Sequence, residues 1–243
     1  MIEEKYRDTI KRLQPIAKAF IEKHKLIYPI KDTLNILSSL GYYIISAPAP
    51  NNLSGFYMKK ENYPFIFVNS THSLGRQNFS LWHEVYHHYI GHKNGISDFD
   101  FNTLEEREAE IFAGLILLPD KEIEKIMFKN PQIDENTIAQ ISDTYRISFQ
   151  ATVVRLMQYE VIDYTTYKEY ALLSGTEKVE ELNELYENNC LSTDILRSTQ
   201  TVRISQNIPK LLERNFEQEL ISGESINSFT EMIGALDYDR TIR

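Results

Sequence analysis

The amino-acid sequence predicts an α+β fold that is mostly helical, with a small three-stranded sheet and a helical extension at its C-terminal end. Most of the chain repeats its apolar residues every three or four positions, as amphipathic helices do. Three short runs, near 42–47, 54–59 and 64–69, are rich in aromatic and β-branched residues and are divided by turn residues, as strands are. The composition, 42% hydrophobic and 25% charged over 243 residues, is typical of a globular protein.

Helices are expected on both sides of these strands. Residues 3–25 form the first amphipathic helix and residues 31–39 the second. After the strands, a helix over 75–91 has few glycine or proline breakers. A further helix over 103–117 ends at Pro119, because proline disfavours helical geometry in the residue before it.

The later part of the chain is also predicted to be helical. Helices near 120–128, 135–144 and 148–158 complete the expected core, with Ser148 as an N-cap. We expect residues 1–160 to form one domain. Residues 161–243 form a helical C-terminal domain or extension that recognises a partner, covers a cleft, makes a dimer or has no separate role.

The residues from His83 to His87 follow the pattern H-E-x-x-H on the helix predicted over 75–91. Positions four apart lie about 40° from each other around a helix axis, so His83 and His87 share one face. Two imidazoles placed in this way can bind one Zn²⁺ ion, and Glu84 lies beside them as a candidate general base. The pattern therefore predicts a metal-dependent hydrolase, most simply a peptidase.

The alternative is that these are surface residues of an ordinary helix, because the five-residue pattern also arises by chance. The run Phe79-Ser80-Leu81-Trp82 before it is apolar, however, which predicts that this helix is largely buried. Two histidines and a glutamate in such a helix need partners, and a metal ion satisfies all three.

A zinc site of this kind needs a third protein ligand. In the helix predicted over 103–117, Glu106 shares the face of the apolar residues, and Glu110 follows one turn later. We expect Glu106 to be the ligand and Glu110 to accept the free N–H of a ligand imidazole. Glu105, Arg107 and Glu108 are expected to be solvated.

Two stretches resemble the ImmA/IrrE family of zinc metallopeptidases. Residues 76–87 are similar to the zinc helix of that family. Residues 106–113, followed by Leu117-Leu118-Pro119, resemble its E-x-x-A-N/D-x-F-A…L-L-x-P pattern. The similarity covers roughly residues 10–160, and weaker matches lie at 53–56, 65–69, 147–148 and 154–156.

The resemblance implies a zincin-like metallopeptidase fold and a gluzincin-like zinc endopeptidase. Carried over residue by residue, His83, His87 and Glu106 match the Zn²⁺ ligands, and Glu84 matches the general base. The implied substrate is a protein, typically a helix-turn-helix transcriptional repressor, in a mobile-element, phage or stress-response system. One departure is Glu110, which stands where the family usually has asparagine or aspartate.

Charge and composition limit the remaining possibilities. A net charge of −9 argues against direct binding to nucleic acid or to anionic membranes. Cys190 is the only cysteine, so no intrachain disulfide can form, and we expect a cytoplasmic protein. No apolar run approaches the length of a membrane span, and the N-terminus does not read as a signal peptide. The oligomeric state stays open.

Other hypotheses for the function remain open. The helices at 135–144 and 148–158 could form a DNA-binding helix-turn-helix, with Gln150, Thr152 and Arg155 facing the bases, although the pair has few basic residues. The chain could also be a regulatory module that binds a protein or DNA without cutting it, or a toxin-like hydrolase.

The sequence also suggests which segments surround the predicted active site. The strand containing Ile66, Phe67 and Val68 is expected to offer the edge along which a substrate binds, and residues 95–101 are expected to line the cleft. Tyr86 points away from the two ligand imidazoles and is expected to pack in the core. The remaining histidines are expected to be structural or exposed; they are His24, His72, His88 and His92.

Overall fold

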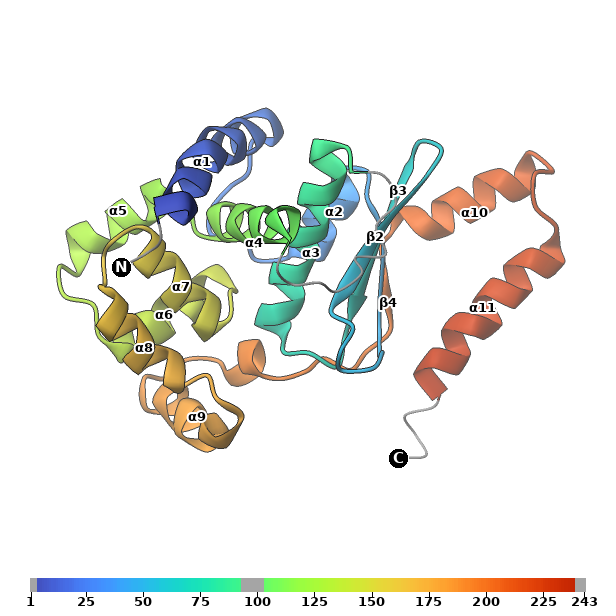
Figure 1. Ribbon diagram of the computed structural model, residues 1–243. Helices are drawn as coiled ribbons and strands as arrows, with labels where there is room; N and C mark the ends of the chain where they lie inside the picture. Colours follow the sequence, from blue (N-terminus) through green and yellow to red (C-terminus); the bar gives the residue numbers. More distant parts are fainter. Residues whose placement is uncertain (1–3, 93–102, 239–243) are drawn as a thin grey trace.

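The computed structural model describes residues 4–92 and 103–238, and it has the α+β architecture that the sequence predicts (Figure 1). Residues 95–101, which we expected to line the cleft, lie outside the described residues. The α-helices are α1 (Glu4–His24), α2 (Thr33–Ser39), α3 (Leu74–Ile90), α4 (Leu104–Leu117), α5 (Asp120–Lys129), α6 (Glu135–Tyr145), α7 (Phe149–Gln158), α8 (Tyr164–Leu172), α9 (Val179–Asn188), α10 (Asn207–Glu217) and α11 (Gly223–Tyr238). The strands are β1 (Tyr43–Ala47), β2 (Gly55–Lys60), β3 (Tyr63–Asn69) and β4 (Arg203–Ile204).

The sheet has four strands in the described residues, so the prediction of three was wrong. Its order is β2-β3-β1-β4, with β1 parallel to β3 and the other pairs antiparallel. The fourth strand is two residues long and comes from the C-terminal part of the chain. It pairs with Ile45 and Ser46 of β1, from which it is separated by more than half of the sequence. Such a short, distant strand leaves no periodicity to detect.

The strand order also corrects the prediction of the substrate-binding edge. The strand β3, which contains residues 66–68, lies between β2 and β1, whereas β2 is the outermost strand on its side. An edge strand keeps one row of backbone N–H and C=O groups free of pairing within its sheet. Among the described strands, the edge beside α3 is therefore β2.

Helix α3 runs against the sheet and is crossed by α4 (Figure 1). Trp82, Val85 and Tyr86 on α3 are fully buried, as the apolar run before the H-E-x-x-H residues predicted. The start of the helix also needs a small residue. A Cβ at Gly75 would lie 2.7 Å from the backbone nitrogen of Ser148, so the glycine allows α3 to lie directly against the start of α7.

The helices α6 and α7 belong to the core. Thr152 and Arg155 are 0% and 1% exposed, and the Arg155 guanidinium donates to the carbonyl oxygen of Leu118 and pairs with Asp120. Neither side chain is available to read bases, so the helix-turn-helix alternative is wrong. Ser148 caps α7 as predicted, because its hydroxyl accepts a hydrogen bond from the backbone N–H of Ala151.

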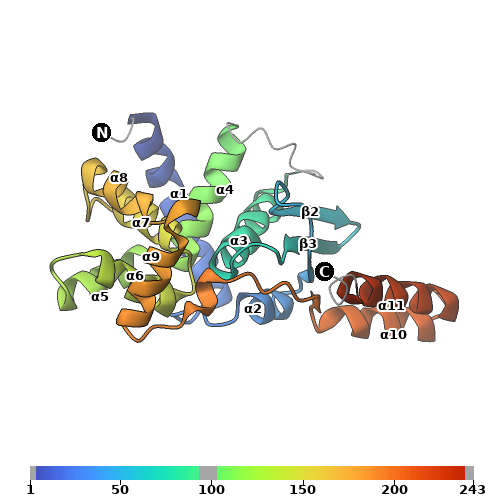
Figure 2. The ribbon, with the colours of Figure 1, turned by 90° about the horizontal axis from the view of Figure 1, so that it is seen from below.

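The first part of the chain after α7 also contributes to the hydrophobic core. Tyr186 of α9 and Ile195 are fully buried, and Tyr186 donates a hydrogen bond to Ser142 of α6. Beyond β4, the helices α10 and α11 extend away from the sheet (Figure 2). None of the helices in residues 4–92 and 103–238 has the length and hydrophobicity needed to cross a bilayer.

Candidate metal centre

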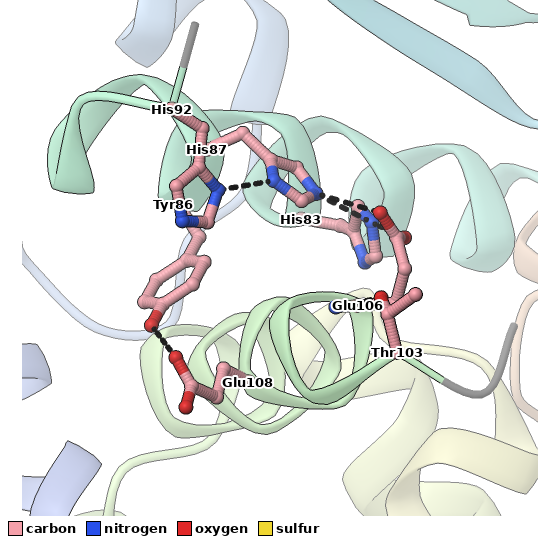
Figure 3. Close-up of polar contacts among 7 residues, drawn as sticks. All are labelled: His83, Tyr86, His87, His92, Thr103, Glu106 and Glu108. Atoms are coloured by element: carbon pink, nitrogen blue, oxygen red, sulfur yellow. Dashed lines mark hydrogen bonds and ion pairs between the residues drawn. The ribbon is translucent and has the colours of Figure 1, made fainter. Parts of the chain in front are cut away.

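Three side chains from two crossing helices meet at one point (Figure 3). His83 and His87 project from the same face of α3, as their spacing predicted. Glu106 projects toward them from the first turn of α4, where the Thr103 hydroxyl accepts a hydrogen bond from the Glu106 backbone N–H and caps the helix. The sequence prediction of these three candidate ligands is matched by their placement, since all three donor groups lie within 4.8 Å of one another.

The spacing of the donor atoms fits a metal ion. His83 Nε2 lies 2.9 Å from Glu106 Oε2 and 3.2 Å from His87 Nε2, and His87 Nε2 lies 3.5 Å from Glu106 Oε1. Tetrahedral zinc holds its nitrogen and oxygen ligands at about 2.0–2.1 Å, which separates the ligands by roughly 3.3 Å. Two imidazoles and one carboxylate are also a donor set that zinc accepts in catalytic sites. The residues present therefore fit a divalent metal.

The electrostatics of the cluster show strong coupling between its members. Burial alone lowers the pKa of His83, but the hydrogen bond that His83 donates to Glu106 and the nearby Glu84 carboxylate outweigh it, so the pKa is raised. The hydrogen bond from His83 holds the pKa of Glu106 below its ordinary value. Burial, with His83 next to it, lowers the pKa of His87 to about 4, so this imidazole is neutral near pH 7. Neutral imidazole is the form that binds metals.

Glu84 lies beside the cluster in a site formed by α3 and β2. It is 4% exposed, and its Oε2 atom is buried with no hydrogen-bond partner among the described residues. Burial is the main reason that the pKa of Glu84 is raised to about 7, and the nearby Glu106 carboxylate raises it further. His83 and a hydrogen bond from the backbone of Tyr57 act in the opposite direction and lower it in part. A carboxylate with such a pKa is suited to accept and release a proton at neutral pH.

The first position of strand β2 needs a glycine, because its backbone lies very close to β3 there. A Cβ built on Gly55 would lie 2.7 Å from the carbonyl oxygen of Phe67 and 3.6 Å from Glu84 Oε1. The backbone of the edge strand therefore lies next to Glu84, the candidate general base. Sequence reasoning did not assign a role to Gly55, although its position near the start of a strand was visible.

The partner of the second imidazole is not the one that we predicted. Glu110 is exposed, and no hydrogen bond in the described chain joins it to either candidate ligand, so its expected contact with an imidazole N–H is wrong. Instead, His92 Nδ1 lies 2.9 Å from His87 Nδ1. Gly91 adopts a left-handed conformation (φ 81°) and ends α3, and the His92 backbone N–H bonds back to His87. This turn brings His92 over the last turn of the helix.

Glu108 corrects a second expectation. It is 8% exposed rather than solvated, and it accepts a hydrogen bond from the Tyr86 hydroxyl at 2.5 Å and pairs with Arg12 of α1. Figure 3 shows Tyr86 pointing away from His83 toward Glu108, so the prediction that Tyr86 packs in the core is confirmed. The misplacement of Glu108 arose because α4 is covered by α1 as well as α3, which a single amphipathic face does not reveal.

The other histidines hold structural contacts. His72 contacts the carbonyl oxygen of Asn51, His88 contacts the Tyr42 hydroxyl, and His24 packs against Phe20. These three predictions are confirmed, whereas His92 contacts the candidate ligand His87.

One comparison with known protein families gives a match. Residues 37–157 match the model of the Peptidase_M78 family, described as an IrrE N-terminal-like domain. The match includes the whole of α3 and α4, and with them His83, Glu84, His87 and Glu106. No curated protein matches the chain.

Proposed function

Residues 37–157 belong to the IrrE N-terminal-like family of M78 peptidases, and from this premise we propose that the chain is a zinc-dependent, gluzincin-like endopeptidase. The observation that carries the proposal is the convergence of His83, His87 and Glu106 beside a buried carboxylate that has no partner for one of its oxygens. His83, His87 and Glu106 would hold the ion. Bound zinc supplies Lewis acidity and lowers the pKa of a coordinated water.

Glu84 is the proposed general base. Its raised pKa and its position between α3 and β2 allow it to accept a proton from the attacking water and to pass it to the leaving amine. The walls of the site exclude bulk solvent from this carboxylate, because it is almost completely buried. Proton transfer would therefore take place in a low-dielectric environment, in which the interactions of charges are strengthened.

The edge strand β2 is the proposed docking element for the substrate backbone. An extended peptide that pairs with β2 would add a strand to the sheet and pass Gly55, next to Glu84. The absence of a side chain at Gly55 leaves room for the backbone of the substrate to approach the general base. We infer that the protein cuts an extended segment of its target.

We further propose that the target is a regulatory protein, a helix-turn-helix transcriptional repressor, in a mobile-element, phage or stress-response system in the cytoplasm. This part rests on the family resemblance of residues 76–87 and 106–119 alone. Glu110, which departs from the family pattern, is exposed beside the site and leaves the proposed ligands and base intact.

The experiment that tests the function compares cells that produce the wild type with cells that produce Glu84→Gln. New protein N-termini are labelled and quantified by mass spectrometry. We expect one protein, a repressor, to gain a new terminus with the wild type and not with the variant, while both purified proteins retain metal. Glu105→Gln is the matched control, because Glu105 is exposed on the same turn as Glu106 and should leave cleavage unchanged.

The non-catalytic alternative gives the opposite result. If the chain regulates by binding, the wild type and Glu84→Gln relieve repression equally and generate no new terminus.

A further inference from the structure

A cavity of about 810 Å³ opens one helical turn from the candidate metal ligands. Phe79 lines it and precedes His83 by one turn of α3, and Glu110 lines it and follows Glu106 by one turn of α4. The cavity is thus continuous with the faces of α3 and α4 that carry the metal centre. Its volume lies within the range of ligand-binding pockets, roughly 300–1,000 Å³.

Apart from Tyr6 of α1, the walls of the cavity come from two different parts of the chain. One wall consists of α3, α4 and α7, within the residues that match the peptidase family. The other wall consists of residues between 171 and 197, outside that match. The backbone N–H of Leu74 donates to the carbonyl oxygen of Arg197 at 2.9 Å, which fixes this second wall against the start of α3. The 3₁₀ helix Thr193–Leu196, which belongs to this second wall, contacts α3 directly.

The middle of the cavity is apolar. Side chains of α3, α7, α9 and the segment after α9 face it; they are Phe79, Ala151, Val154, Leu182, Ile195 and Leu196. Because burial of apolar surface is favourable, such a lining selects a bulky aliphatic or aromatic side chain over a small or charged one.

Charged side chains of both signs line the cavity. Glu110 comes from α4, one turn after Glu106, whereas Arg76 comes from the start of α3 and Arg197 from the segment hydrogen-bonded to it. Within the described residues neither arginine forms an ion pair, and the only side-chain partner of Arg76 is the Ser54 hydroxyl. Two cations without carboxylate partners complement an acidic group on a ligand.

The separation of these features sets a spacing along the ligand. Arg76 precedes His83 by seven residues, which corresponds to about 10 Å along a helix axis. An extended peptide advances about 3.3 Å per residue, so this length spans roughly three residues.

We propose that this cavity is the specificity subsite of the enzyme. It takes a substrate segment with a bulky apolar residue beside the cleaved bond and an acidic residue roughly three positions away. Residues 171–197 are therefore the part of the chain that selects the substrate. This inference rests on the proposed peptidase function, because it assigns the cavity to the same site.

The test uses peptidyl hydroxamates, whose hydroxamate group binds a catalytic metal and whose side chains extend into neighbouring subsites. The set contains acetohydroxamate alone, an alanyl compound, a leucyl compound, and the leucyl compound extended by glutamate or by lysine three residues away. Each peptidyl compound is made in two forms, with the peptide running from the hydroxamate toward its N-terminus or toward its C-terminus. Affinity for the zinc-loaded full chain is measured by titration calorimetry. For one chain direction we expect the leucyl compound to bind roughly ten- to a hundredfold more tightly than the alanyl one, and glutamate to bind more tightly than lysine.

Two variants connect these preferences to the cavity. Leu182→Trp fills the apolar part and should abolish the preference for leucyl over alanyl, whereas Leu220→Trp, at a residue 68% exposed and outside the cavity, should keep it. Arg197→Glu should reverse the preference for glutamate, whereas Arg203→Glu, at an exposed arginine outside the cavity, should not. Zinc content and thermal unfolding of each variant show whether it is folded.

The results separate the subsite from the function. If acetohydroxamate binds but the leucyl and alanyl compounds have equal affinity, or if Leu182→Trp and Arg197→Glu retain the wild-type preferences, the subsite assignment is wrong and the peptidase proposal stands. If no zinc is retained and acetohydroxamate does not bind, the proposed function itself fails.

Discussion

The second ring nitrogen of His87 is held by His92: the two Nδ1 atoms lie 2.9 Å apart, while His87 Nε2 faces His83 and Glu106. One of the two nitrogens must donate and the other accept. When His87 binds a metal through Nε2, its Nδ1–H is the donor and His92 the acceptor. Such outer contacts fix the orientation and tautomer of a ligand imidazole.

Replacement of His92 is therefore expected to weaken metal binding without removing a ligand. We expect His92→Phe to lower zinc affinity by about 10- to 100-fold, and His92→Gln, which keeps an acceptor, to recover part of the loss. Competition with a chromophoric chelator measures both. His24→Phe is the control, because His24 packs on Phe20 and should leave zinc affinity unchanged. Equal affinities for the wild type and His92→Phe would show that the contact has no positioning role.

Gly55 allows the edge strand β2 to lie close to β3 beside Glu84. In Gly55→Ala the new Cβ would lie 2.7 Å from the Phe67 carbonyl oxygen, so β2 must shift. We expect the free energy of unfolding to fall by about 1–3 kcal/mol, together with a loss of cleavage, because the displaced strand is the proposed substrate edge. Urea unfolding tests the first effect. Gly234→Ala, in an open position on α11, should not destabilise the protein.

The buried pair of Tyr86 and Glu108 connects α3 to α4 on the side away from the metal centre. Tyr86→Phe removes the donor of a 2.5 Å hydrogen bond and leaves the carboxylate with Arg12. We expect a loss of about 1–3 kcal/mol in the free energy of unfolding, with one metal still bound per chain. Tyr164→Phe, at a tyrosine 44% exposed, is the control and should cost much less. Unchanged stability in Tyr86→Phe would mean that Arg12 alone satisfies Glu108.

His72 gives a pH dependence that is independent of the metal centre. Burial lowers the pKa of His72 below 6.5, and the positive charge of Arg76 lowers it further. The hydrogen bond to the backbone of Asn51 acts in the opposite direction. Its Nδ1 atom is buried without a partner in the described chain, so protonation would add a donor that lacks an acceptor. The unfolded chain therefore binds the proton more readily, and this contribution to stability is lost as the pH falls below 6.5 toward the lowered pKa.

The measurement is chemical unfolding of the wild type and His72→Gln between neutral and mildly acidic pH. We expect the stability of the wild type to fall more steeply on acidification than that of the variant. Parallel pH profiles would show that His72 does not contribute.

The candidate ligands could be predicted because helix periodicity alone places them. The four-residue spacing puts His83 and His87 on one face, and the apolar period of α4 puts Glu106 on the face toward them. Two apolar residues of that period, Ala109 and Phe112, are fully buried.

The errors arose where contacts depend on chain reversals or on distant segments. His92 reaches His87 only because Gly91 adopts a left-handed turn. Glu110 follows Glu106 by one turn, but its side chain lines a cavity instead of contacting the ligand imidazoles. The order of the strands, and with it the identity of β2 as the edge, depends on long-range pairing that no local pattern encodes.

We propose that two imidazoles of α3 and one carboxylate of α4 together hold a divalent cation. Elemental analysis of the purified full chain, after exposure to zinc and removal of the excess, tests this most directly. We expect one zinc per chain in the wild type and much less in Glu106→Ala, with Glu105→Ala equal to the wild type. A wild-type protein that is folded and carries no zinc, or a Glu106→Ala variant that retains it fully, would contradict the claim.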